Sequence, residues 1–501
     1  MFKNVGSNWL VTVVSVVAAY VLTPFTIHKL GGDAYGTWNL INAITGYLGL
    51  LVLGVPMASV RYFAQHVAKG DVRKLNEAIG SCTALYLLLG AIALVVGAGG
   101  FFFFRAYTIP RILEGDAQTA FVLMVVFVSL GFVALLPNAV LSAHDDFVPR
   151  NIVRLWGVLL RLGLTVGLLA MHASLTVLAL VQLACMAFDF ALCWLLVRRR
   201  YPETRMRLSD FNWGMTRSIF AFSMYVLILN AGTRLSFETD SIVIGGYMDV
   251  GKIPYFTVAN SFIIYLMEFL LSIAAVVMPT ATRLQTQGKS AELREIFLKW
   301  SKIALSLTMA AGLFLIVLGP RFIAWWVDPS FEQPAGEVLR ILMISYLVFL
   351  PVRGVALPIL MGLGKAGLST IGFLVMGAVN LGLSILLVRP MGLAGVALGT
   401  AIPNVLFAAA VFLQACKELD VSVVGFLRYV IPRTILGALP VLAVLQWFKD
   451  GLEVRGIGGL FGAGVAMTIV FAVTWVFYVY RNDPYLDLRA FLPRLRTWTR
   501  V

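Results

Sequence analysis

Stretches of about 20 apolar residues recur along the whole chain, and this recurrence constrains the fold more than any other feature. A run of that length crosses a bilayer as an α-helix, because lipid offers no hydrogen-bond partner to an irregular backbone. We predict an all-α polytopic membrane protein from 14 such runs, with the approximate bounds 8–30, 36–60, 77–104, 117–141, 152–171, 175–197, 218–248, 254–282, 300–322, 336–361, 368–388, 394–416, 430–448 and 457–480.

The composition agrees with a membrane protein. Of the 501 residues, 60% are hydrophobic and 13% are charged, whereas soluble domains average about 25% charged residues. No interval between the runs is long enough for a separate soluble domain of ~100 residues. The four cysteines have no CxxC or metal-ligand spacing, and the four histidines are scattered. We therefore expect neither a disulfide framework nor a metal site.

Cationic residues gather in alternate loops. Lys69, Arg73 and Lys74 share one loop, and the segment from Arg198 to Arg207 forms another on the same predicted side. By the positive-inside rule these loops are cytoplasmic, and so are both termini. The net charge of +14 then reflects topology and attraction to membrane lipids, so we do not expect nucleic acid as a partner.

The longest basic loop follows six predicted helices and divides the chain. We expect five parts: an N-lobe at 1–197, a basic cytoplasmic linker at 198–217, a C-lobe at 218–416, two further helices at 417–480 and a basic cytoplasmic tail at 481–501. Because six is an even number, the two six-helix lobes would have the same orientation and a pseudo-twofold axis along the membrane normal.

Polar residues inside several runs share one helical face, because residues three, four, seven or eleven positions apart are neighbours on a helix. Such a stripe within a membrane must face a cavity or another part of the protein. The residues predicted to line a polar cavity are Asn8, Thr12 and Ser15 in the first run, Asn39 and Asn42 in the second, Asn230 in the seventh and Tyr265 in the eighth.

The run 152–171 contains a ladder of cations. Arg150, Arg154, Arg161, Thr165 and His172 lie within about 40° of one line along this helix. Arg150 and Arg154 either extend to the cytoplasmic surface or face a cavity. Arg161 lies near the bilayer centre, where an arginine costs at least ~3 kcal/mol. It therefore needs a partner or a polar cavity.

The turn at 172–174 suggests a partner for this ladder. It is so short that the helices on either side must be antiparallel, which places residue n level with about residue 346 minus n. Asp189 is then level with Gly157, between Arg154 and Arg161. Asp189 either forms a buried pair with one arginine, which leaves the other for a ligand, or takes part in ion coupling.

Two more arginines occupy apolar segments. Arg234 lies one turn from Glu238 on the same helical face, so the two side chains either neutralise each other or form the wall of a cavity. Arg353 lies between Pro351 and Pro358, where we expect a broken helix that lines a cavity.

Catalytic and nucleotide-binding signatures are missing. The sequence contains no HExxH, no GxSxG and no GxxxxGK[ST]. A membrane glycan polymerase or ligase would need a large loop for its chemistry, and no loop here exceeds about 20 residues. These features favour a transporter over an enzyme, with two bundles around a polar cavity that opens alternately to each side.

Two segments carry a family resemblance. TPFTIHKLGGDAYGTWNLINAITGYLGLLVLGVPMASVRYFAQ (23–65) contains a Leu-Gly-x-x-x-Tyr-Gly element at 30–36, and RLSFETDSIVIGGYMDVGKIPYFTVANSF (234–262) contains an Asp-x-Ile-x-Ile-Gly element at 240–245. In these elements and in its layout the chain resembles the Wzx-type polysaccharide (O-antigen or exopolysaccharide) flippases of the multidrug/oligosaccharidyl-lipid/polysaccharide (MOP) exporter superfamily, which have a MATE-like fold.

The resemblance implies a function. It implies movement of an undecaprenyl-pyrophosphate-linked oligosaccharide across a bacterial inner membrane for polysaccharide biosynthesis, by a protein that works as a monomer beside polymerase or export machinery. It also implies a cationic cavity, which corresponds to Arg154, Arg161 and Arg234 in this chain. We add Arg353 to this set because of its position in the expected helix break. No cofactor is expected. We expect four acidic residues either to couple transport to H⁺ or Na⁺ or to balance the cationic charge: Asp189, Glu238, Asp240 and Glu268.

Three alternatives remain open. A multidrug or cation antiporter of the same superfamily would have an acidic cavity and an acidic residue on its first helix, which this chain does not have. A lipid II flippase would share both the fold and the cationic cavity. A membrane glycan polymerase or ligase is disfavoured by the short loops.

Overall fold

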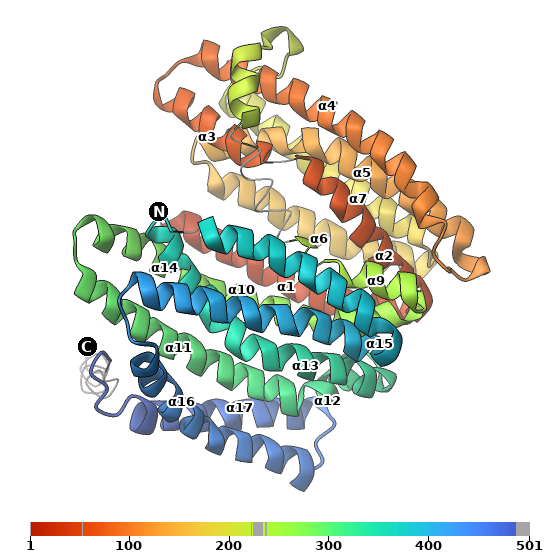
Figure 1. The fold of residues 1–501 in the computed structure, drawn as a ribbon. Coiled ribbons are helices and arrows are strands. Elements are labelled where there is room, and N and C mark those ends of the chain that lie inside the picture. The colour runs from red at the N-terminus through yellow and green to blue at the C-terminus, as the bar shows by residue number, and fades with distance from the viewer. Residues whose placement is uncertain are drawn as a thin grey trace, which may run out of the picture. The chain divides into compact units, whose positions relative to one another are not determined.

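The computed structural model describes residues 2–52, 54–221, 223, 234–235, 238–365 and 367–486. Within these residues the secondary structure is helical and no strand occurs. Twelve helices in the described residues are long and apolar enough to cross a membrane. The predicted all-α polytopic class is confirmed, and Figure 1 shows the long helices running side by side.

Two causes explain why the structure describes 12 spans and the sequence predicted 14. The predicted runs 368–388 and 394–416 are the two halves of one element, α15 (Gly367–Glu418), which reverses direction at Gly392, where φ is 59°. A β-carbon at Gly395 would overlap the carbonyl of Leu387, so the two halves pack tightly after the reversal. The predicted run 218–248 is interrupted by residues outside the described part of the chain, chiefly 224–233.

The chain forms two compact units. Unit 1 comprises Met1–Arg234 and Glu238–Pro254, and unit 2 comprises Leu235–Phe237 and Tyr255–Val501. The elements of unit 1 are α1 (Phe2–Leu30), α2 (Gly32–Leu48), η1 (Gly49–Val52), α3 (Val55–Ala68), α4 (Val72–Phe104), α5 (Arg111–Ala143), α6 (Phe147–Met171), α7 (Leu175–Arg200), η2 (Leu208–Asp210), α9 (Asp240–Tyr247) and η3 (Val250–Lys252).

Unit 2 contains the remaining long helices. Its elements are α10 (Ile253–Thr286), which begins at the unit boundary, α11 (Ser290–Val317), α12 (Gly319–Trp326), η4 (Pro329–Phe331), α13 (Glu332–Pro351), η5 (Val352–Ala356), α14 (Leu357–Gly362), α15, α16 (Val423–Gln446), η6 (Trp447–Gly451), α17 (Ile457–Thr474) and η7 (Trp475–Val479). The internal symmetry between the predicted lobes stays a prediction.

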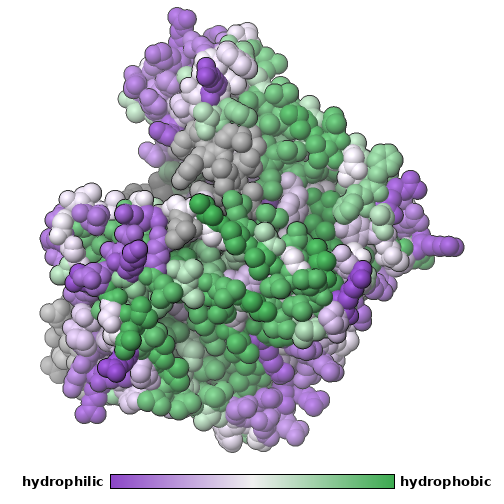
Figure 2. Space-filling model, viewed as in Figure 1, coloured by the Kyte–Doolittle hydropathy of each residue, from purple (hydrophilic) through white to green (hydrophobic). Residues whose placement is uncertain are grey.

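Side-chain character follows the demands of a bilayer. Figure 2 shows hydrophobic side chains over the middle of the visible helices and hydrophilic side chains at the helix ends. Large apolar side chains also point outward, as Val95 on α4 and Phe461 on α17 do with exposed fractions of 73% and 71%. In water such exposure would be costly, and in lipid it is favourable, so these surfaces are the expected contact with membrane lipids.

A carboxylate fixes the start of α7 in unit 1. Asp116 on α5 accepts hydrogen bonds from the backbone N–H groups of Leu175 and Thr176, at 2.6 and 2.9 Å, and from the Thr176 hydroxyl at 2.6 Å. These are the N–H groups that a helix leaves unpaired at its N-terminus, and a carboxylate is the favoured partner there. The contact ties α7 to α5 and so positions one wall of the pocket described below.

A fully buried ion pair holds the C-terminal end of the described chain against α11 in unit 2. The Lys302 ammonium lies 2.5 Å from the Asp483 carboxylate, and their side chains are 1% and 0% exposed. Burial alone would raise the pKa of Asp483, but hydrogen bonds from Lys302, the Tyr485 amide and the Tyr429 hydroxyl hold that pKa below its usual value. The pair therefore attaches the segment after η7 to α11 and α16.

Replacing Lys302 by methionine should destabilise the protein by about 3–5 kcal/mol, because it leaves the buried Asp483 carboxylate without its cation. The double variant K302M/D483N should lose less than the sum of the two single losses, as measured by unfolding midpoints of the purified protein in detergent. Because the Asp483 pKa is lowered, the contribution is complete above the unfolded-state pKa of about 3.9 and is lost as the pH falls through the folded-state pKa. Strictly additive losses would contradict the pairing.

Candidate functional site

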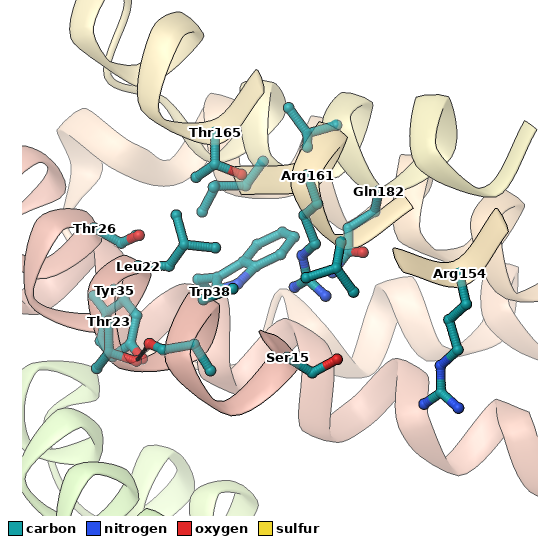
Figure 3. A pocket seen from close by; sticks show the side chains of 15 residues that line it. Ser15, Leu22, Thr23, Thr26, Tyr35, Trp38, Arg154, Arg161, Thr165 and Gln182 are labelled. Carbon is teal, nitrogen blue, oxygen red and sulfur yellow. Dashed lines mark hydrogen bonds between the residues drawn. The ribbon is translucent and has the colours of Figure 1, made fainter. Parts of the chain in front are cut away.

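A polar pocket of about 480 Å³ lies in unit 1 and is enclosed by α1, α2, α6 and α7. Figure 3 shows it from close by. Its lining consists of Ser15, Ala18, Ala19, Leu22, Thr23 and Thr26 from α1, Tyr35 and Trp38 from α2, Arg154, Val158, Arg161 and Thr165 from α6, and Leu178, Val181 and Gln182 from α7.

The pocket is cationic. Arg154 and Arg161 line it with exposed side chains, and they are separated by two helical turns, roughly 10 Å along α6. None of the described lining residues is acidic. In Figure 3, Arg161 points toward the space between Trp38 and Gln182, whereas Arg154 lies farther along the same helix. The ladder predicted on this helix therefore faces the pocket at these two positions.

Neutral hydrogen-bonding groups complete the lining. Ser15, Thr23, Thr26 and Thr165 contribute hydroxyl groups, and Gln182 contributes an amide. Tyr35 and Trp38 add aromatic surface from the start of α2. A ligand in this pocket would meet two cations, several neutral donors and acceptors, and a flat apolar wall.

A hydrogen bond fixes two of the pocket helices to each other. The Asn151 amide on α6 donates to the Ser7 hydroxyl on α1 at 2.9 Å. Asn151 is 1% exposed, so the bond is shielded from competing water. It sets the height of α1 relative to α6, and with it the height of Ser15 relative to Arg154.

Asp189 lies where the short turn predicted it. A β-carbon at Gly157 would lie 3.3 Å from Oδ1 of Asp189, which confirms the predicted register of α6 and α7. Among the described residues no salt bridge joins Asp189 to Arg154 or Arg161, and its buried Oδ1 has no hydrogen-bond partner in that part of the chain. Both guanidinium groups consequently remain available to a ligand in the pocket.

Arg234 and Glu238 form the salt bridge that their spacing allowed. The pair lies in unit 1, against α2, and neither residue lines the pocket. A β-carbon at Gly46 would lie 2.8 Å from Nη1 of Arg234 and 3.5 Å from Oε2 of Glu238. A direct role of this pair in substrate binding stays a prediction.

Arg353 lies in unit 2, in the π-helical turn η5 that separates α13 from α14. The break expected between the two prolines is therefore present. The Arg353 guanidinium carbon lies 5.1 Å from the ring centre of Phe373 and 5.8 Å from that of Phe349, which is cation–π geometry. Its assignment to a cavity stays a prediction.

The remaining predicted residues are dispersed. Asn230 and the side chain of Asn8 lie outside the described part of the chain. Asn42 donates to the Trp38 carbonyl at 2.8 Å, within α2. The others that do not line the pocket are exposed Thr12 and half-buried Asn39 in unit 1, buried Asp240 at the start of α9, and half-buried Tyr265 and exposed Glu268 on α10 in unit 2.

The sequence reasoning assigned Ser15, Arg154 and Arg161 to the cavity and missed several of their neighbours. Thr165 belongs to the predicted ladder on α6 but was not assigned to the cavity. Gln182 lies on the face of α7 that points to the arginines, so a helical-wheel argument extended to α7 would have assigned it. Tyr35 and Trp38 belong to or follow the Leu-Gly-x-x-x-Tyr-Gly element. No periodicity identified them, because they lie in the first two turns of α2.

Comparison with known proteins decides the family. The family described as "Polysaccharide biosynthesis protein" matches residues 1–285. The chain belongs to this family. The match covers more than half of the chain and includes all four helices of the pocket, and it confirms the predicted resemblance to polysaccharide flippases at the level of the family.

Two curated relatives of this family member are similar over most of its length. An "Uncharacterized membrane protein EpsK" of Bacillus subtilis is 22% identical over 485 residues, which cover 94% of each chain. A "Putative O-antigen transporter" of Shigella flexneri is 20% identical over 390 residues, which cover 76% of this chain and 90% of that protein.

Two solved structures show the same fold. An inward-facing multidrug resistance MATE transporter of the MOP superfamily matches with a TM-score of 0.71 and 17% identity, over 81% of this chain and 98% of that one. The lipid II flippase MurJ in an inward closed conformation matches with a TM-score of 0.68 and 14% identity, over 93% of this chain and 98% of that one. The predicted MATE-like fold is thereby confirmed.

If water fills the pocket, cysteines at two positions on α1 should react with a thiol reagent at different rates. Ser15→Cys should react with a hydrophilic, charged thiol reagent, because Ser15 lines the pocket. Val13→Cys should react far more slowly, because Val13 is 54% exposed and does not line the pocket, so we expect it to contact lipid, where thiolates do not form. Labelling is measured in membranes by mass shift. Equal rates at the two positions would contradict a hydrated pocket.

Proposed function

We propose that the protein moves an undecaprenyl-pyrophosphate-linked oligosaccharide from the cytoplasmic to the outer leaflet of a bacterial inner membrane. The cationic pocket carries this proposal. Binding the polar head in unit 1 shields it from the bilayer core, while the lipid tail stays in the membrane. Alternating access, driven by H⁺ or Na⁺, then exposes the head on the opposite side.

The electrostatics of the pocket favour an anionic headgroup. A guanidinium near the bilayer centre is costly unless an anion or water surrounds it. Arg154 and Arg161 face the same pocket without a carboxylate in its described lining, so an anionic ligand offsets both charges. Guanidinium groups bind phosphate oxygens bidentately, and this interaction is stronger in a site of low dielectric constant. A pyrophosphate has enough oxygens to engage both arginines.

The neutral side of the pocket suits a glycan. Hydroxyl groups of sugars pair with Thr23, Thr26, Thr165 and the Gln182 amide, which act as donors and acceptors. The apolar face of a sugar ring packs on an aromatic side chain such as Trp38. The volume of about 480 Å³ lies in the usual range of ligand pockets, roughly 300–1,000 Å³. It fits the pyrophosphate with the first sugars, so longer glycans would extend beyond it.

The comparisons support the same direction. The family description concerns polysaccharide biosynthesis, and one relative bears the name of a putative O-antigen transporter. Both support a transporter of lipid-linked glycan, which needs no catalytic residue. A monomer is sufficient for this activity, and contact with a polysaccharide polymerase or export machinery is part of the proposal.

A lipid II flippase is the second candidate. The pocket would bind the pyrophosphate of lipid II by the same chemistry, and the solved MurJ structure shares the fold. A multidrug antiporter for cationic compounds is disfavoured, since such a substrate would be repelled by Arg154 and Arg161. The MATE neighbour supports the fold and leaves the substrate class open.

Arg161→Gln and Arg154→Gln should each reduce flipping about 10- to 100-fold, because a hydrogen bond to a charged group contributes about 1.5–3 kcal/mol. Arg161→Lys should lose less, since it keeps the charge but not the bidentate geometry. Arg217→Gln, at an exposed position of unit 1 outside the pocket, is the matched control and should be unaffected.

The assay uses proteoliposomes that contain undecaprenyl-pyrophosphate bearing a labelled oligosaccharide, with lectin accessibility as the readout of translocation. Unchanged flipping in both glutamine variants, with folded protein, would disprove the pocket assignment. Transport of lipid II at a higher kcat/KM than of the oligosaccharide would favour the second candidate.

A further inference from the structure

The basic linker that follows α7 is held against unit 1 at its start. Arg200 donates two hydrogen bonds to the Asp146 carboxylate, at 2.9 and 3.0 Å, and the Tyr201 hydroxyl donates to it at 2.7 Å. The His144 ring stacks on the Tyr201 ring, with 3.7 Å between the ring centroids. Because His144 and Asp146 belong to the turn between α5 and α6, these contacts fix the first residues of the linker to that turn.

Farther along, the linker is attached to the first turns of α4. The Asn76 side chain donates to the Glu203 carbonyl at 3.0 Å and accepts from the Arg205 backbone N–H at 2.8 Å. The Ser81 hydroxyl donates to the Asn212 carbonyl at 3.2 Å and accepts from the Asn212 N–H at 3.1 Å. Figure 1 shows this part of the chain, in yellow-green, beside the start of α4. These bonds fix the height of each linker residue along α4.

A glycine allows the middle of the linker to approach the same helix. A β-carbon at Gly80 would lie 2.7 Å from the Arg207 carbonyl oxygen and 2.9 Å from the carbonyl carbon of Asp210. Only a glycine leaves room for backbone at these distances. Residues 207–210 therefore lie level with Gly80.

The contacts with α4 give the depth of the linker in the membrane. A spanning helix enters the hydrocarbon where its charged side chains end, and on α4 the last charged residue is Glu77. From Asn76 to Ser81 the helix rises by about 8 Å. The linker therefore descends from the level of the lipid headgroups at Glu203 to the edge of the hydrocarbon at Asn212.

The descending linker exposes apolar and cationic side chains. Leu208, Phe211 and Trp213 are 55%, 43% and 72% exposed, and the rings of Phe211 and Trp213 lie 6.3 Å apart. Arg205 and Arg207 are exposed as well. We call these five residues the linker patch.

The order of these groups matches one leaflet of a bilayer. The arginines lie toward the headgroup level, and Phe211 and Trp213 flank Asn212 at the edge of the hydrocarbon. Tryptophan is the side chain that membrane proteins favour at this depth. Cations just outside it attract anionic lipids. A leaflet that contains anionic lipid therefore satisfies both halves of the linker patch.

We infer that the linker patch is a lipid-binding surface on the side predicted to be cytoplasmic. Leu208, Phe211 and Trp213 insert among the upper acyl chains, and Arg205 and Arg207 bind the phosphate groups of anionic phospholipids. Hydrogen bonds to α4 hold the linker in place, so the patch is presented to the leaflet at a fixed depth. This inference is independent of the substrate that the pocket binds.

Quenching by brominated lipids tests the linker patch in the full-length protein. A fluorophore is attached at Ser209→Cys, next to Leu208, in a chain with Cys185→Ala, which removes the one native cysteine that is not buried. The protein is reconstituted in phosphatidylcholine vesicles with an equal fraction of brominated phosphatidylcholine or brominated phosphatidylglycerol. Both lipids should quench. Phosphatidylglycerol should be enriched about fivefold or more at the fluorophore, since a cation near the surface attracts an anionic leaflet.

Two pairs of charge variants separate the linker patch from the overall charge of the protein. R205Q/R207Q should bring the enrichment close to one. R283Q/K289Q removes the same charge from exposed positions in unit 2 and is the matched control, which should keep the enrichment. F211S/W213S should weaken quenching by both lipids severalfold, because its apolar anchor is lost. Each variant is compared as a monodisperse, folded fraction.

Three results would overturn the inference. Absence of quenching by both lipids in the folded parent protein would show that water, a second copy or another protein covers the linker patch. Unchanged enrichment in R205Q/R207Q would remove the arginines from lipid binding. Equal loss of enrichment in R283Q/K289Q would assign the preference to the net charge of the protein.

Discussion

The free-energy cost of placing a guanidinium group within a membrane constrains the structure of unit 1. Arg161 lies near the middle of a helix that spans the bilayer, and it needs polar surroundings. The structure supplies them as a pocket between four helices, not as a salt bridge to the nearby Asp189. A pair would have neutralised the site. A pocket with unneutralised cations is a place for an anion, and this distinguishes a binding site from a structural ion pair.

Close backbone contacts are the second organising feature. Gly36, Gly245 and Gly251 each occupy a position where a β-carbon would meet another element. These contacts allow α9 and η3 to pack along α2, and they explain why both family elements contain glycine. The elements thus serve the packing of unit 1, and Tyr35 of the first element also lines the pocket. Helix α2 therefore contributes both to the packing of unit 1 and to the lining of the pocket.

Local geometry determined how much the sequence alone revealed. The register of Asp189 against Gly157 was predictable because a very short turn leaves two helices no freedom to slide. The face that carries Arg154 and Arg161 followed from helical periodicity. The contribution of Trp38 and the docking of η3 were not predictable, since both depend on contacts between residues far apart in the chain. The reversal at Gly392 was also located correctly, because it lies between the predicted runs 368–388 and 394–416.

The most direct test of the central claim is a binding measurement on the purified protein. A short-chain polyprenyl-pyrophosphate oligosaccharide is titrated into the parent protein and into the R154Q/R161Q variant, with the matched monophosphate as second ligand, and bound lipid is counted by native mass spectrometry. The account predicts tighter binding of the pyrophosphate than of the monophosphate by the parent protein, and loss of that preference in the variant. An equal preference for pyrophosphate in both proteins would contradict it.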